Sequence, residues 1–93
     1  MTALEALTRA MRAQAARECE LLSAKTLLAT ANATLLVAGT IAGKNADERD
    51  ANLRASTGDE RAEVDELTRA VIFARCDAEI ARLEYDATLR VAP

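Results

Sequence analysis

The sequence predicts an all-α protein, an antiparallel helical hairpin with two long arms and a short middle helix at the turn. Alanine occurs 22 times in 93 residues, and Phe73 and Tyr85 are the only aromatic residues. The single proline is the last residue, and there are three glycines. Strands favour β-branched and aromatic residues, whereas this chain is rich in the helix formers Ala, Leu, Arg and Glu. Apolar residues also recur at helical spacing, so we expect one helical domain spanning residues 1–93.

The first long helix is predicted over residues 3–39. One apolar stripe in it steps by threes and fours, as in a coiled coil, and includes Leu21, Leu28 and Leu35. A second stripe runs beside the first; its larger members are Leu4, Leu7, Met11, Leu22 and Leu36. Two stripes on one helix indicate two neighbours, which we expect to be the returning arm and another subunit.

Self-association is also expected because the chain has few large side chains. A hairpin packed mainly through alanine buries little apolar area, and each buried Å² contributes only about 25 cal/mol. A chain of this size with such a core is marginal on its own. We therefore predict a homo-oligomeric helical bundle, with a dimer favoured.

A short middle helix is predicted over residues 46–55, after a turn between Gly39 and Gly43. Asn45 and Glu48 have the spacing of a capping box, in which each side chain accepts a hydrogen bond from the other residue's backbone N–H.

The third helix is predicted over residues 58–90. Thr57 and Glu60 repeat the capping-box spacing, so we expect a second helix start there. Its seam includes Leu67, Val71 and Tyr85, and we expect Phe73, Ile80 and Leu83 to widen this seam.

The Gly43-Lys44 pair does not form a phosphate-binding loop. A Walker loop has four residues between its two glycines, a Ser or Thr after the lysine, and a strand before it. Here three residues separate Gly39 from Gly43, Asn45 follows the lysine, and a helical pattern precedes the turn. We expect a turn, and no nucleotide cofactor.

No catalytic or metal-binding pattern stands out elsewhere. The chain has no histidine, and Cys19 and Cys76 lack zinc-finger spacing, so we expect them to be buried structural thiols. The carboxylates from Asp59 to Glu66 lack the spacing of a calcium loop. We therefore predict a protein that is not an enzyme and that binds no metal or cofactor.

Charge and hydropathy bear on localisation. The net charge is −3, and no basic patch suited to duplex DNA is present, so nucleic-acid binding is not expected. Residues 26–43 are 18 uncharged positions, but only six are Leu, Val or Ile, so a membrane span is not expected either. With no apolar run near the N-terminus, we expect no signal peptide and a cytoplasmic location.

The turn region resembles a stretch in small, uncharacterised helical proteins of tailed bacteriophages and prophages. These proteins carry a G-K-N-A-x-x-R turn, a short helix, and a Thr-x-x-Glu start to a long helix. The matching residues are Gly43, Lys44, Asn45, Ala46, Arg49, Leu53, Thr57 and Glu60. The resemblance covers about a quarter of the chain, and it implies a phage protein in a bacterial host, without implying an activity.

Three functions stay open from the sequence. The first is a self-associating helical protein that binds, and in doing so can inhibit, a host or phage protein; the surface expected to do so comprises Lys44, Arg49, Asp59, Glu63 and Glu66. The second is an accessory protein of phage replication or recombination that contacts phosphates through Arg9, Arg12, Arg17 and Lys25. The third is a purely structural oligomer.

Overall fold

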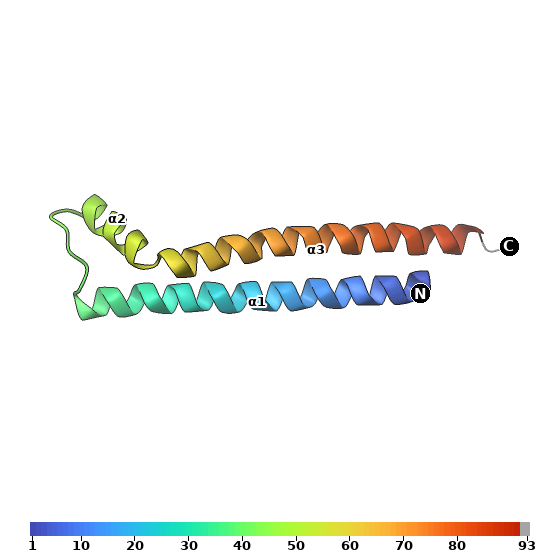
Figure 1. The fold of residues 1–93 in the computed structure, drawn as a ribbon, viewed down its shortest axis with the longest axis horizontal. Helices are drawn as coiled ribbons and strands as arrows, with labels where there is room; N and C mark the ends of the chain where they lie inside the picture. Colours follow the sequence, from blue (N-terminus) through green and yellow to red (C-terminus); the bar gives the residue numbers. More distant parts are fainter. Residues whose placement is uncertain (92–93) are drawn as a thin grey trace.

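The computed structural model describes residues 1–91 and shows three helices arranged as a hairpin (Figure 1). The long helices α1 (Ala3–Ala38) and α3 (Gly58–Val91) lie side by side and antiparallel, and the short helix α2 (Ala46–Ser56) lies at the turn. The N-terminus and the end of α3 therefore lie at the same end of the molecule.

The helix ends lie within one residue of those expected from the sequence. α1 stops at Ala38 because Gly39 takes the left-handed conformation, with φ 66°, and donates its N–H to the Leu36 carbonyl. At the other end, the Thr2 hydroxyl accepts a hydrogen bond of 3.1 Å from the Glu5 N–H. Helix α1 is thus capped at both ends by local contacts.

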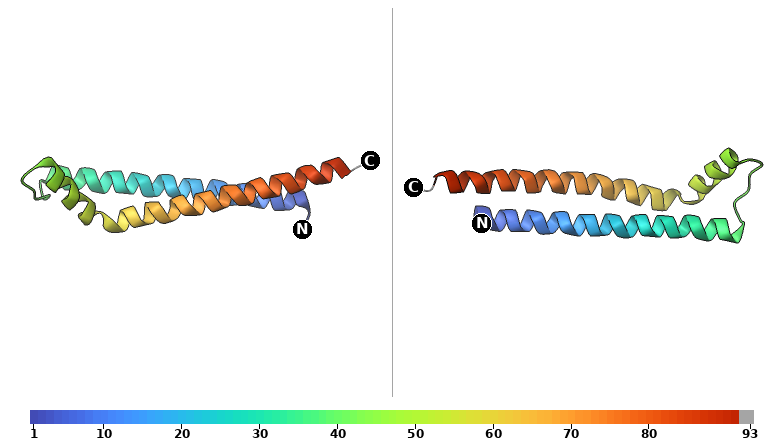
Figure 2. Two further views of the ribbon diagram at one scale, coloured as in Figure 1. Left: turned by 90° about the horizontal axis from the view of Figure 1, so that it is seen from above. Right: turned by 180° about the vertical axis from the view of Figure 1, so that it is seen from behind.

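The two long helices pack along one seam each. The buried apolar residues are Ala24 on α1 and Val71, Ala74, Ala78 and Ala81 on α3. Four of these five are alanines, so the helices approach closely but bury few side-chain atoms. Figure 2 shows α1 and α3 crossing at a shallow angle, as expected for helices that pack by threes and fours.

The larger seam residues predicted from the sequence are shielded to different degrees. Val71 is only 2% exposed, whereas Leu21, Leu28, Leu35, Leu67 and Tyr85 are half-buried. By contrast, the prediction that three further residues of α3 pack beside this seam is wrong for the single chain. Phe73, Ile80 and Leu83 are all exposed, because α1 alone is too narrow to cover both flanks of α3.

The junction between α2 and α3 also differs from the expected capping box. The Thr57 hydroxyl does not accept from the N–H of Glu60; it donates to the Leu53 carbonyl at 3.0 Å and accepts from Arg61 Nε at 3.1 Å. Thr57 therefore ends α2 instead of capping α3 with its side chain. It is fully buried, and the chain bends sharply there (Figure 1).

The molecule is long and thin. Its extents are 72 × 18 × 14 Å, and its radius of gyration is 20.3 Å, against about 12 Å for a compact domain of this length. Its accessible surface is 6871 Å², about 1,700 Å² more than the roughly 5,200 Å² typical of a compact protein of this mass. Much surface that a compact fold would bury is therefore left open.

Candidate interaction surfaces

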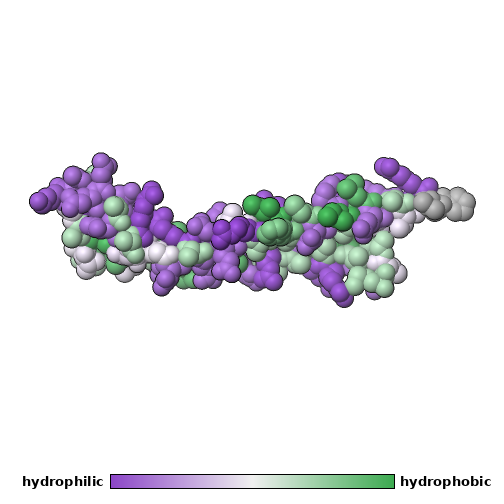
Figure 3. Space-filling view, turned by 45° about the horizontal axis from the view of Figure 1, so that its top comes forward, coloured by the Kyte–Doolittle hydropathy of each residue, from purple (hydrophilic) through white to green (hydrophobic). Residues whose placement is uncertain are grey.

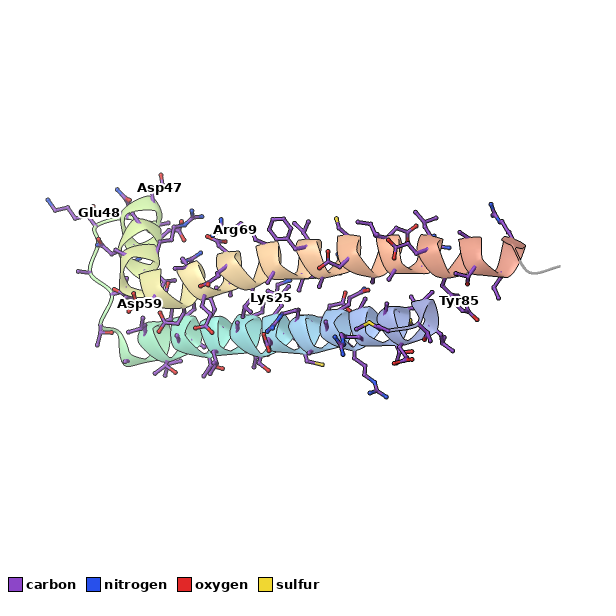
Figure 4. All side chains as sticks on the ribbon, turned by 45° about the vertical axis from the view of Figure 1, so that its right-hand side comes forward. Lys25, Asp47, Glu48, Asp59, Arg69 and Tyr85 are labelled. Carbon is purple, nitrogen blue, oxygen red and sulfur yellow. The ribbon has the colours of Figure 1, made fainter. Side chains whose placement is uncertain are left out.

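The turn is built around the cap of α2. The Asn45 side chain accepts a hydrogen bond of 2.8 Å from the Glu48 N–H, as expected from the sequence. The returning bond differs, because the Glu48 carboxylate accepts from the Lys44 N–H at 3.2 Å and not from that of Asn45. Both acidic residues of the first turn, Asp47 and Glu48, lie where the helix dipole favours negative charge (Figure 4).

Further contacts fold the loop back on α2. The Asn52 amide donates to the Ala42 carbonyl at 2.5 Å, and the Arg49 guanidinium donates to the Gly43 carbonyl at 3.4 Å. Gly43 has φ 155°, and a Cβ there would lie 2.7 Å from the Arg49 backbone nitrogen. The glycine before Lys44 is thus required by the close approach of the loop to α2.

The residues expected to form a partner surface are all exposed but do not form one pocket. Lys44 and Arg49 lie at the turn, and Asp59, Glu63 and Glu66 lie on the first turns of α3. Of these five, Glu63 lines a groove shared with Cys19, Glu20, Ser23, Ala24, Leu27 and Leu67. Helix α2 has no buried residue and is held by its caps and a few contacts with α3. The turn therefore offers a projecting polar surface.

One flank of the long hairpin carries ion pairs. Both Arg75 Nε and the Arg75 terminal nitrogen donate to the same Glu18 carboxylate oxygen, at 3.0 and 2.9 Å. The Arg75 hydrogen bond, helped by one from Gln14, holds the pKa of Glu18 below its usual range. Further along α3, Arg82 contacts Glu79 and lies 3.4 Å from Asp86. The hydrogen bond between Arg82 and Glu79 lowers the pKa of Glu79 and raises that of Arg82.

The opposite flank contains an apolar groove of about 510 Å³ between α1 and α3. We call it the alanine groove; it is lined by Met1, Ala6, Arg9, Ala10, Ala13, Arg17, Ala70, Phe73, Ala74 and Asp77. Phe73 lies at the edge of this groove and is 69% exposed. Figure 3 shows hydrophobic side chains gathered in separate groups between hydrophilic ones. This surface was not identified from the sequence, although alanines at a helical interval and an aromatic on the facing arm were its visible signal.

The cysteines are not the buried thiols expected from the sequence. Cys19 and Cys76 are both free and exposed. The Glu18–Arg75 pair fixes the register, and in antiparallel helices it sets Cys19 level with Ala74. Cys76 is therefore close to Cys19 in its position along the hairpin axis. Both thiols are nevertheless exposed and lie away from the seam.

One polar atom is buried without a partner. The side-chain oxygen of Asn32 accepts no hydrogen bond within the described part of the chain. Asn32 lies in the part of α1 after Lys25 that carries no charged residue.

Residues 1–91 contain no group of three or more His, Cys, Asp or Glu side chains that could hold a metal ion. Helix α1 is long and apolar enough to cross a membrane by length and composition, a property shared by core helices of soluble proteins and by signal sequences. The chain matches no family model, and it shows no significant similarity to any curated protein or solved structure.

Proposed function

We propose that this chain is a non-enzymatic helical protein that works as a self-associated bundle. The observation that carries the proposal is the contrast between its core and its surface. The buried core consists of four alanines and one valine, while large apolar side chains, Phe73 among them, are exposed. Self-association would remove the apolar surface of those side chains from contact with water, and this removal is favourable. The hairpin alone leaves that surface exposed.

The lack of a suitable catalytic arrangement is consistent with this function. The open grooves between α1 and α3 are lined mainly by alanine, leucine and charged side chains with no histidine. The two exposed thiols have no neighbouring histidine to activate them, because the sequence contains none. The arrangement suits packing against another helical surface better than it suits chemistry.

Sedimentation equilibrium between about 1 and 100 µM tests self-association, a range chosen because homodimers of moderate affinity change state within it. We expect a species of twice the chain mass of 9.9 kDa. A monomer throughout this range, with helical circular dichroism, would overturn the proposal.

The turn is the surface we propose for a second protein, of host or phage origin. It projects from the bundle, it is polar, and it carries the residues of the phage-like motif, including Lys44 and Arg49. Lys44→Glu should abolish capture of that protein from phage-infected lysate. Lys25→Glu, which changes the only other lysine, should not. Equal capture by both variants would place the partner elsewhere.

The length of α1 favours a second candidate, a membrane-inserted hairpin. That protein would require detergent for extraction and would float with phospholipid vesicles. A self-associated bundle would stay in the aqueous fraction, so one flotation experiment separates the two.

A further inference from the structure

The two flanks of the hairpin differ in a way that selects one of them for docking. On the flank of Glu18 and Arg75, charged groups are already paired within the chain. On the flank of the alanine groove, small side chains leave a hollow, and the ring of Phe73 stands exposed at its edge. A hollow and a protruding ring on the same flank are the two halves of a self-complementary contact.

The charges around the alanine groove are also self-complementary. Arg9 and Arg17 come from α1, and Asp77 comes from α3. Arg17 pairs with Glu20, while Arg9 and Asp77 form no ion pair within residues 1–91. A two-fold axis parallel to the long helices brings the α1 side of one copy against the α3 side of the other, so each Asp77 can meet an arginine.

The open surface has the size that a stable dimer needs. Each chain exposes about 1,700 Å² more than a compact protein of its mass, and stable homodimers bury roughly 2,000 Å² or more from both chains together. Two chains together therefore expose enough surface for such an interface. A second copy is therefore a sufficient occupant, with no other protein needed.

We propose that a second copy of this chain docks on the alanine groove, with Phe73 of each copy in the groove of the other and Asp77 facing Arg9 or Arg17. This arrangement specifies the interface of the self-association proposed above and rests on it. It also assigns the small side chains at Ala6, Ala10 and Ala13 a purpose, since larger ones would fill the space that the ring occupies.

The first test compares Phe73→Asp with Leu22→Asp in the full chain. Both side chains are about equally exposed, at 69% and 67%, but Leu22 does not line the alanine groove. Aromatic anchors at interface centres dominate affinity, so Phe73→Asp should weaken dimerisation about 30-fold or more. Leu22→Asp should change the dimer dissociation constant less than about 3-fold, as surface changes outside an interface do. Equal effects of the two substitutions would refute this interface.

Exchanging two charges provides a test in which dimer affinity is first lowered and then restored. Asp77→Arg should weaken the dimer, and adding Arg9→Asp should restore part of the lost affinity, because the pair is then reversed across the interface. Arg17→Asp is tested with Asp77→Arg in the same way. The proposed contact would be contradicted if neither double variant regained dimer affinity.

Cross-linking tests the same geometry without disturbing the fold. In a chain carrying Cys19→Ser and Cys76→Ser, Ala13→Cys lies in the groove and Ala15→Cys does not. Because α1 of one copy faces α3 of the other, each of these variants is mixed with an Asp77→Cys chain in the same background. A short bismaleimide should join position 13 to position 77 in high yield, and position 15 to position 77 in low yield. A monomeric wild type would defeat the proposed function itself, whereas a dimer cross-linked through position 15 would defeat only this interface.

Discussion

Within residues 1–91, Glu18 and Arg75 form the one ion pair between the two long helices, across 57 residues of sequence. It marks the register of α3 along α1, in which Glu18 lies level with Arg75. Both partners remain substantially exposed, so the pair adds only modestly to stability.

The Glu18–Arg75 pair should make the free energy of unfolding depend on pH. Because the folded pKa of Glu18 lies below its ordinary value of 4.5, the pair stabilises the fold above that pH. This contribution is lost as the pH falls through the lowered folded pKa. Urea denaturation from about pH 6 to pH 3 should therefore show a smaller loss of stability for Glu18→Gln than for wild type. The exposed Glu84→Gln is the control, and indistinguishable profiles for all three proteins would contradict the assignment.

Asn45→Ala should loosen α2 first. The substitution removes the acceptor for the Glu48 N–H, and losing such a cap costs about 1 kcal/mol. Since α2 makes few contacts with the rest of the molecule, hydrogen exchange of its amides is the sensitive measurement. Asn45→Asp keeps an acceptor and should exchange like wild type. Unchanged exchange in Asn45→Ala would show that the loop contacts alone hold the helix.

Thr57→Val should destabilise the bend between α2 and α3. Its buried hydroxyl serves both Leu53 and Arg61, and leaving those groups unpaired costs about 1–2 kcal/mol. Thr68→Val removes a similar hydroxyl bond, 2.7 Å to the Val64 carbonyl, at an exposed site. Thermal denaturation should therefore show a clear decrease only for the first variant.

Val71→Ala tests how much the seam depends on its one larger buried side chain. Removing two methyl groups from a site that is 2% exposed should cost about 2 kcal/mol. Val37→Ala makes the same change where the side chain is 89% exposed, and it should stay within about 0.5 kcal/mol of wild type. Equal losses would mean that something other than the hairpin seam covers Val37.

Gly43→Ala should be more damaging than Gly58→Ala. An added Cβ at Gly43 meets the Arg49 backbone at 2.7 Å, in a backbone conformation that other residues rarely adopt. Gly58 has open space and lies in the first turn of α3, where alanine should be neutral or stabilise by about 0.4–1 kcal/mol. Chemical denaturation of the two variants gives the comparison, and a harmless Gly43→Ala would mean that the loop can move away from α2.

The sequence by itself determined the helices, because their signals are local. Helical spacing, Gly39 as the stop of α1 and Asn45 as the start of α2 depend on neighbours within four residues, and the structure places these features accordingly. The tertiary structure decided what the local pattern left open. The same spacing at Thr57 permitted a capping box, but packing buried its hydroxyl against Leu53 and Arg61 instead. Likewise, the spacing predicts that Phe73 widens the seam, yet it is exposed because only one helix is available to cover α3 and that helix meets it through alanines. Which side chains a seam covers depends on the width and register of the partner helix, and the sequence of a single arm does not contain that information.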